Sequence, residues 1–492
     1  MSHALRNGWP DVSLGEVIMA LWIEWLAAVG QLRAACHRSR TFAWLILCLA
    51  AFSCRSDKAG ITSYVRVFSF RQQAYHRFLH FFHTNGVDLD ALTALWVKLC
   101  LILFQPFQVG SRLVCLADGI KAPKEGKKMP GVKSLHQQSG SNSKPEHIMG
   151  HSLQAVSLLV KGVGGHVTAI PLASRIHEGV VFSNRDQRTL LDKLVILLTS
   201  IIKTWDRQVV LIADAYYASG KIIKALLAKG HHLVTRAKKN AVAYFLPDAP
   251  ATRRKGRPPI YGQKIALRDL ARQEKNFIEA PSPVYGERNV TLRYRVADLL
   301  WRPVGHLIRF VIVKHPTRGT VFLVCTDLTL SAIEIIALYG YRFKIEVGFR
   351  QAVHVIGGYA YHFWMMAMKP LRRGQGDQYL HRTSDDYRNA VRRKLGAYHL
   401  YVQLGCIAQG LMLHLALNHA NLVWQHFRSW LRTIRYDLPP SELIVSHALQ
   451  TGLPAFIAYP SHNDNLQKII REYQQHLHIS SNDALFPLPA AA

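Results

Sequence analysis

The stretch SAIEIIALYGYRFKIEVGFRQAVHVI, residues 331–356, predicts one long helix that carries several charged side chains. It opens with a capping box, because Ser331 can cap the helix and Glu334 follows three residues later, ahead of an apolar run. No proline interrupts the stretch before Gly357 and Gly358, which are typical of a helix end. The functional interpretation of the chain depends on the polar face of this helix.

Tyr339, Arg342 and Glu346 are spaced three and four residues apart, so a helix of 3.6 residues per turn places them on one face. Arg350 follows one turn later and extends this polar stripe along an otherwise apolar helix. Taken alone, the stripe is better explained by an exposed i, i+4 ion pair between Arg342 and Glu346. Two aspartates upstream favour a functional interpretation.

A chain of 492 residues is too long for one core, and its length predicts about three domains. The composition is 49% hydrophobic, which predicts a globular rather than a disordered protein. Lys and Arg number 61 against 31 Asp and Glu, a formal net charge of +30 that predicts a polyanionic partner, with nucleic acid as the first candidate. A ribosomal or membrane-surface protein is the alternative, but a ribosomal protein rarely has so much apolar sequence.

The seven cysteines are scattered without a CxxC pair, which is typical of a reducing cytosol and argues against a disulfide framework or a cysteine zinc site. No basic region directly precedes a hydrophobic one near the N-terminus, so we expect no signal peptide. The most apolar run, residues 41–53, is shorter than the roughly 20 residues that span a bilayer. We therefore expect a cytoplasmic protein without a membrane segment.

The patterns divide the chain into a helical region (1–107), a core of alternating strands and helices (108–240 and 331–368), a β-rich insertion (241–330) and a second helical region (369–492). This predicts an α/β fold with a core, a β-rich insertion and flanking helical regions. Residues 69–76 in the first helical region mix basic and aromatic side chains, which makes this region a candidate for contacting nucleic acid. In the last region, the apolar helix 397–417 is a candidate for dimerisation.

Individual elements follow from periodicity and turn signals. Helices are expected at 14–35, 42–51, 70–85, 88–104 and 219–228, and a further one is capped by Ser183 or Asn184 and runs to Trp205. Strands are expected at 111–118, 151–160, 166–176, 208–214, 232–235, 264–270, 290–297, 306–314 and 320–326. His76, His80 and His83 share one helix face, but without a nearby acidic or cysteine partner aromatic packing explains them better than a metal site.

Two predicted strands end at an aspartate, Asp118 in SRLVCLAD and Asp214 in QVVLIAD, and the helix presents Glu346. Carboxylates at the carboxyl ends of strands point into the crevice where open α/β sheets bind ligands. Three clustered carboxylates cannot all stay ionised without a cation, and Mg²⁺ is the natural cation for such ligands. Two such ions could clamp a phosphodiester during in-line displacement, which predicts metal-dependent phosphoryl transfer on a nucleic acid.

Basic loops could hold the phosphate backbone of that nucleic acid. The loop 121–144 is rich in lysine, and RRKGRPP at 253–259 contains Arg257 in a Gly-Arg-Pro sequence that can lie in a narrow minor groove. The second loop is explained as well by a solvated surface. Asp327 and Glu334 are explained by turn chemistry and by the capping box.

The chain resembles bacterial insertion-sequence transposases of the DDE kind, whose RNase H-like core is shared with retroviral integrases. The matching residues are the aspartates of LAD-Gly119 and IAD-Ala215-Tyr216-Tyr217, and the run DAYYASGKIIKALLAKGHHLVTRAKKN. The spacing Tyr339-x2-Arg342-x3-Glu346 resembles the Tyr-Arg-Glu-Lys signature of the insertion-sequence-four group. The resemblance covers about residues 110–360, and the combined motifs are more specific than any one alone.

The resemblance implies an RNase H-like fold and a two-metal site of Asp118, Asp214 and Glu346, with Mn²⁺ able to replace Mg²⁺. It also implies that DNA is contacted by Tyr339, Arg342, Arg350, His354, Arg236, Lys238, Lys239 and Arg257. Water would cut the end of the mobile element, and the freed 3′-hydroxyl would attack target DNA. The implied partners are double-stranded terminal inverted repeats, target DNA and a second copy of the chain, in the nucleoid of a bacterial cell.

One position departs from the signature, because the group has a lysine seven residues after the glutamate and this chain has Val353. Arg350 and His354 lie on either side and could replace its phosphate contact. Alternatively, this copy is catalytically impaired and only binds DNA. A metal-dependent DNA nuclease of the same superfamily is the third hypothesis.

Overall fold

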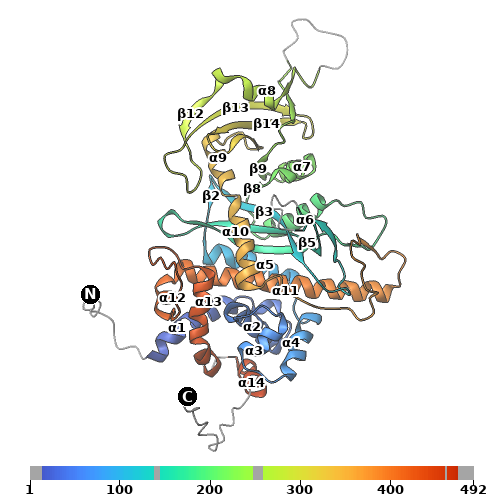
Figure 1. The fold of residues 1–492 in the computed structure, drawn as a ribbon, viewed down its shortest axis with the longest axis vertical. Coiled ribbons are helices and arrows are strands. Elements are labelled where there is room, and N and C mark those ends of the chain that lie inside the picture. Colours follow the sequence, from blue (N-terminus) through green and yellow to red (C-terminus); the bar gives the residue numbers. More distant parts are fainter. Residues whose placement is uncertain (1–13, 138–144, 248–258, 460–462, 475–492) are drawn as a thin grey trace, which may run out of the picture.

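The computed structural model describes residues 14–137, 145–247, 259–459 and 463–474. Figure 1 shows a helical layer at the bottom, a large mixed sheet in the middle, and a β-rich part at the top that continues the sheet. This is a mixed α/β architecture, as the sequence predicts. The loop that contains Arg257 lies outside the described residues.

The helical layer combines the two ends of the chain. Its helices are α1 (Leu14–Gly30), α2 (Ser39–Cys54), α3 (Ile61–Val67), α4 (Gln73–His83), α5 (Leu89–Leu103), α11 (Asp385–Asn418), α12 (Ala420–His426), α13 (Glu442–Ala458) and α14 (Asp464–Tyr473). Trp22 of α1 stacks on Phe456 of α13 with ring centroids 4.3 Å apart, and its indole N–H donates to Leu449 O at 3.2 Å. The described parts of the predicted helical regions 1–107 and 369–492 therefore pack together, although they are far apart in sequence.

The central sheet is built by β1 (Gln105–Pro106), β2 (Gln108–Val109), β3 (Arg112–Pro123), β4 (Lys133–His136), β5 (His147–Lys161), β6 (Val167–Ile176), β8 (Val209–Ala213) and β9 (His232–Arg236). Strands β3, β8 and β9 are parallel neighbours, whereas β5 pairs antiparallel with β3 and with β6. The crossover helices are α6 (Leu190–Ile202) and α7 (Gly220–Leu227). A separate pair joins β7 (Val180–Val181) to β16 (Gln378–Tyr379).

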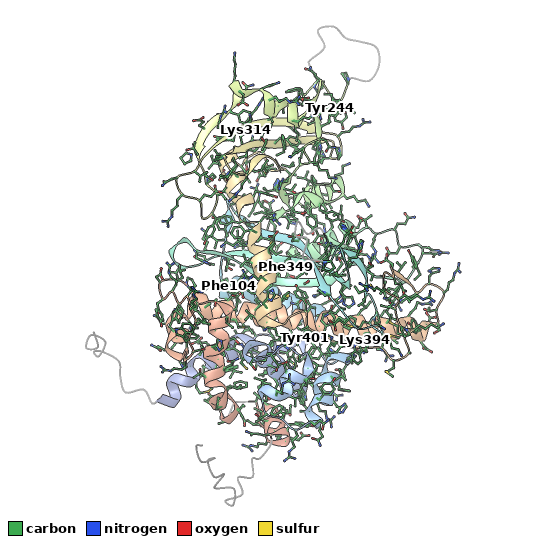
Figure 2. The ribbon with its side chains drawn as sticks, viewed as in Figure 1. Phe104, Tyr244, Lys314, Phe349, Lys394 and Tyr401 are labelled. Atoms are coloured by element: carbon green, nitrogen blue, oxygen red, sulfur yellow. The ribbon has the colours of Figure 1, made fainter. Side chains whose placement is uncertain are left out.

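The β-rich stretch extends the same sheet rather than forming its own, because β15 (Gly319–Cys325) pairs with β9. Beyond β15 follow β14 (His306–His315), β13 (Thr291–Trp301), β10 (Val242–Tyr244) and β11 (Lys264–Ala266), with β12 (Ile278–Pro281) on β13. Figure 2 places Tyr244 and Lys314 in this upper part. The predicted strand 264–270 is wrong in its second half, where α8 (Leu267–Arg272) forms and buries Leu267 and Leu270.

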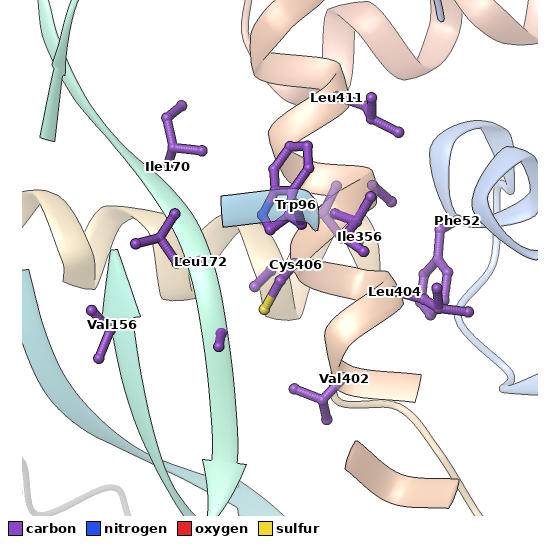
Figure 3. Close-up of a cluster of buried hydrophobic side chains, with 14 of the residues drawn as sticks. Phe52, Trp96, Val156, Ile170, Leu172, Ile356, Val402, Leu404, Cys406 and Leu411 are labelled. Atoms are coloured by element: carbon purple, nitrogen blue, oxygen red, sulfur yellow. The ribbon is translucent and has the colours of Figure 1, made fainter. Parts of the chain in front are cut away.

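The core between sheet and helices is centred on α11 (Figure 3), whose buried residues include Leu404, Cys406 and Leu411. Trp96 of α5 is fully buried, and its indole N–H donates to Pro171 O of β6 at 2.9 Å. An added Cβ at Gly410 would lie 2.1 Å from the Trp96 ring, so glycine lets α11 approach α5 at this point. Among the described helices, α11 alone is long and apolar enough to cross a membrane, but nearly all of its most apolar part is buried in the protein.

Residues 331–356 do not form the single helix that the sequence predicts. The capping box of Ser331 and Glu334 is confirmed and starts α9 (Ala332–Gly340). The chain then tightens, since Arg342 N–H donates to Tyr339 O three residues back, and it resumes as α10 (Phe343–Gln351). A π-turn over Ala352–Ile356 ends at Gly357, whose φ of +66° is the left-handed conformation that glycine adopts without a steric cost.

Candidate functional site

Strand pairing brings Asp118 and Asp214 together. The parallel register of β3 and β8 aligns Ala117 with Ala213. Asp118 is the next residue of β3, and Asp214 directly follows the last residue of β8. Asp214 follows the end of β8, where its Oδ1 accepts the Tyr216 N–H at 2.9 Å. Asp118 does not end its strand as predicted, because β3 pairs with β5 as far as Pro123.

Arg342 joins the helix to this part of the sheet. Its Nη1 lies 3.2 Å from Asp118 Oδ2, and its Nη2 lies 2.6 Å from Glu346 Oε1. The i, i+4 pair with Glu346 is the one that the sequence suggests, whereas the contact with Asp118 spans 224 positions. One guanidinium therefore links a carboxylate of β3 to a carboxylate of α10, and the Arg342 and Asp118 side chains are only 22% and 18% exposed.

The pKa of Asp118 is raised to about 6, chiefly by burial and also by the negative charges of Asp214 and Glu346, while the Gly119 N–H and Arg342 oppose the shift. The influence of both carboxylates means that the three predicted acidic residues interact electrostatically. Burial is the largest cause, so a cation bound nearby would favour the ionised form of Asp118.

The three carboxylates are the hard oxygen ligands that Mg²⁺ and Mn²⁺ accept, so their chemistry fits a divalent metal. In the described part of the chain, however, no three His, Cys, Asp or Glu side chains are arranged closely enough to hold a metal ion. The Arg342 guanidinium lies against two of the three carboxylates. Metal binding by all three would therefore require Arg342 to give up at least one of these contacts.

Tyr339 lies on α9, one turn before Arg342. Burial raises the pKa of the Tyr339 hydroxyl, and Arg236 at the end of β9 opposes this shift through its charge and a side-chain hydrogen bond. Asp214 also acts on Tyr339 electrostatically. The predicted residues Tyr339 and Arg236 thus belong to the same neighbourhood as the aspartates, and Lys238 and Lys239 follow as exposed side chains.

Arg350 and His354 are exposed beyond Glu346, and Val353 between them is 42% exposed. Arg350 forms no ion pair with another residue that the structure describes, since Glu346 is paired with Arg342 instead. The π-turn contains both Val353 and His354, and such turns are frequent at functional sites. Phe349 of α10, labelled in Figure 2, is partly buried and packs against the hydrophobic core.

The sequence interpretation missed Tyr217 and Gln154 as members of this neighbourhood. Tyr217 is 2% exposed, and its hydroxyl donates to Gln154 Oε1 at 2.7 Å. Gln154 pairs with Gly119 across β5 and β3, directly beside Asp118. A buried glutamine inside the apolar run of β5 was the available signal, because a buried amide needs hydrogen-bond partners.

Other predicted features have structural explanations. His83 Nε2 lies 2.7 Å from Lys394 Nζ, and its Nδ1 lies 2.8 Å from Leu79 O, so this histidine is engaged in packing contacts of α4. Lys394 lies on α11 with Tyr401, as Figure 2 shows. Asp327 accepts the Thr329 N–H at 2.9 Å and pairs with Arg112 at 2.7 Å, which confirms a structural role.

A basic chain whose mixed α/β sheet brings acidic side chains together on adjacent strands has the features of a nuclease. Residues 32–298 match the family of DDE superfamily endonucleases, and the chain belongs to this family. The match includes Asp118 and Asp214 but ends before Glu346. No curated protein matches the chain at a significant level.

Proposed function

We propose that the chain is a DNA transposase of the insertion-sequence-four kind, with an RNase H-like core. It would cut the ends of its mobile element and join the freed 3′-hydroxyl to target DNA. The observation that carries this proposal is the Arg342 bridge, which connects Glu346 of α10 with Asp118 of β3, beside Asp214. Membership of the DDE superfamily supports an endonuclease or transposase activity in general.

Asp118, Asp214 and Glu346 would hold the divalent metals, Mg²⁺ or Mn²⁺, that members of this superfamily typically use. When bound, these ions supply the positive charge that stabilises the attacking and leaving oxygens of an in-line displacement. The protein side chains orient the DNA. Arg342 and Arg350 can each bind two phosphate oxygens, because a guanidinium is a planar fork of donors.

Other DNA contacts would come from Tyr339, His354, Arg236, Lys238 and Lys239, with Arg257 in the loop outside the described residues. The net charge of +30 supports a polyanionic substrate. Cutting two ends and joining them in one complex requires at least two active sites, so we propose a homodimer on DNA in the bacterial cytoplasm. The apolar helix α11 was the sequence candidate for dimerisation, but its buried residues pack inside the chain, which leaves less of it for a partner.

The test is cleavage of a plasmid that carries the DNA bordering the gene, with Mg²⁺, the full-length chain and Asp214→Asn as the control. We expect nicks with free 3′-hydroxyls at inverted repeats, followed by joining to a second plasmid. Cleavage without joining would favour a stand-alone nuclease instead. Binding without cleavage would favour an impaired derivative, for which the valine at position 353 is the specific observation.

A further inference from the structure

Two segments that are distant in sequence meet beyond the carboxyl end of β3. The Met365 N–H donates to Lys128 O at 2.9 Å, and the Leu371 N–H donates to Lys127 O at 2.7 Å. The Lys128 ammonium also donates to Met366 O at 3.2 Å. The loop after β3 and the segment after the π-turn are thus joined by their backbones into one surface.

The segment after the π-turn is anchored by side chains that are buried in the core. Tyr361, Phe363, Met365 and Met368 are all buried. The Tyr398 hydroxyl of α11 donates to Phe363 O at 2.6 Å, which fixes the backbone in place. The intervening side chains point outward, so that Trp364 is 62% exposed and Met366 is 82% exposed. The backbone that carries these two large apolar side chains is therefore fixed, while the side chains themselves are exposed to solvent, which is typical of a binding surface.

Four basic residues belong to the same two joined segments as this apolar pair. We define the Trp364 surface as Lys127, Lys128, Trp364, Met366, Lys369 and Arg372. None of its four basic side chains is in an ion pair with an acidic residue of the described chain, and Glu125 is the acidic residue nearest in sequence. Unpaired cations beside exposed apolar groups match a ligand that offers both phosphates and apolar faces, as DNA does.

The position of the surface relative to Asp118 follows from β3. Pro123, at the end of the strand, is five positions after Asp118, and the loop with Lys127 continues from there. At a rise of roughly 3.3 Å per residue, Pro123 lies about 17 Å from Asp118. A duplex rises about 3.4 Å per base pair, so this distance corresponds to about five base pairs.

We propose that the Trp364 surface binds duplex DNA on one side of the cleavage point, beginning about five base pairs from the cleaved phosphodiester. Lys127, Lys128, Lys369 and Arg372 contact phosphates, while Trp364 and Met366 lie against sugars and base edges in a groove. This inference rests on the proposed function. It states where the protein binds the part of the DNA that flanks the reacting phosphodiester. A second copy of the chain is a poorer occupant, because two such surfaces would bring like charges together.

The test compares three double variants of the full chain with wild type, by DNA affinity over a range of salt. Lys369→Gln with Arg372→Gln should reduce the slope of log K against log salt by about 2, at about 0.9 for each lost phosphate contact. Trp364→Ala with Met366→Ala should weaken binding about tenfold and leave the salt slope unchanged, because no charge is lost. These side chains are exposed, so the melting temperature should stay within about 2 °C of wild type.

DNA length provides the decisive comparison. Two further duplexes are each truncated to three base pairs on one side of the cleavage point. On one of these two duplexes, both variants should bind as wild type does. The matched control is Trp430→Ala with Arg432→Gln, where the tryptophan is 79% exposed. Trp430 follows α12, which comes directly after α11. The end of α11 lies about 30 Å from Tyr398, the residue that holds Phe363 in place, at 1.5 Å per residue. The control residues are therefore distant from the Trp364 surface. Any effect of the control substitutions on DNA affinity should be the same on the full-length duplex and on the duplex that abolishes the defect of the other two variants.

Three results would overturn the inference. The two variants could bind long DNA as tightly as wild type, or keep their defect on both truncated duplexes. A loss of dimer mass without a loss of DNA affinity would assign the surface to a second copy of the chain. Absence of DNA binding by the wild type would instead reject the proposed function, so the two failures are distinguishable.

Discussion

The guanidinium of Arg342 contacts Asp118 at 3.2 Å, and through its other nitrogen it contacts Glu346 at 2.6 Å. A protein cation thus lies between two carboxylates that the proposed function assigns to metal ions. A metal that is bound by the same oxygens must compete with Arg342. In this arrangement, Arg342 keeps two like charges close together until a metal or a DNA phosphate takes over one of its contacts.

We predict that Arg342→Ala binds Mn²⁺ more tightly than wild type when DNA is absent, roughly tenfold, because one competing positive charge is removed. Cleavage of DNA should nevertheless fall at least a hundredfold, because the phosphate contact is lost. Mn²⁺ titration by electron paramagnetic resonance at pH 8, well above the Asp118 pKa of about 6, measures the affinity. Arg350→Ala is the control and should leave Mn²⁺ affinity near wild type, since Arg350 contacts none of the three carboxylates in the structure. Weaker Mn²⁺ binding by Arg342→Ala would contradict the competition.

The acidic residues give a second prediction. Asp118→Asn, Asp214→Asn and Glu346→Gln keep the size of each side chain but remove a negative charge. We expect cleavage to be lost in each, while DNA affinity is retained or increased, because repulsion of the phosphates decreases. Asp298→Asn is a matched control, since this aspartate pairs with Arg309 in the β-rich part, away from the three carboxylates. Wild-type cleavage by any one of the three variants would remove that residue from the site.

The strand and helix periods predicted much of the architecture from sequence. The strands that carry or precede Asp118 and Asp214 were located to within a few residues, because buried parallel strands are short runs of apolar residues. The capping box of Ser331 and Glu334 was also identified, since its signal is local. The end of β3 was missed, because the residues after Asp118, which include a glycine and a proline, continue the strand by pairing with β5, which is a tertiary interaction. Likewise, α6 begins at a capping box of Thr189 and Asp192 rather than at the residues proposed from sequence.

The site was predictable in its residue types but not in its connections. Local spacing indicates the pair of Arg342 and Glu346, whereas its extension to Asp118 depends on how α10 packs over the sheet. The pairing of Tyr217 with Gln154 likewise depends on strand register. The break at Tyr341 directly follows Gly340, a residue type that often ends helices but that the sequence interpretation passed over. The π-turn at Ala352 interrupts a stretch that has no proline. Packing, rather than helix propensity, decides such breaks.

A third prediction concerns acid stability. His151 is fully buried, with Nδ1 2.8 Å from the Tyr361 hydroxyl and Nε2 2.9 Å from Pro130 O, and burial lowers its pKa to about 3. The unfolded chain takes up a proton at this histidine near pH 6.5, and the folded chain does not. Its contribution to the free energy of unfolding is therefore complete above pH 6.5 and is lost as the pH falls from 6.5 towards 3, by up to about 1.4 kcal/mol per pH unit.

His151→Gln should accordingly lower stability at pH 8 by about 1–3 kcal/mol, because buried hydrogen bonds are lost. Below pH 6.5, the free energy of unfolding should also fall less steeply with decreasing pH, by the contribution of about one proton, or about 1.4 kcal/mol per pH unit. Urea unfolding at several pH values measures both effects. His306→Gln, at an exposed position of β14, should change neither. An unchanged acid slope in His151→Gln would show that this histidine is protonated in the folded chain.

The last prediction concerns the valine at the position of the signature lysine. Val353 is 42% exposed in the π-turn, so Val353→Lys can place its ammonium in solvent without disturbing the core. Arg350 is exposed one turn beyond Glu346 and lacks an acidic partner in the described chain, which leaves its guanidinium available for phosphate. His354 is a weaker replacement, because a histidine is mostly neutral at pH 7.

We therefore expect Arg350→Ala to lower cleavage of element ends at least tenfold while changing the free energy of unfolding by less than about 0.5 kcal/mol, as for other exposed positions. Val353→Lys should raise cleavage or leave it unchanged, and in the Arg350→Ala background it should restore part of the lost activity, because it supplies a new cation on the same segment. His354→Ala should have the smaller effect of the two alanine variants. Cleavage and urea unfolding, measured on the same preparations, separate loss of function from loss of fold. If Arg350→Ala cuts normally and Val353→Lys activates strongly, then Arg350 does not replace the lysine and the natural chain is an impaired copy.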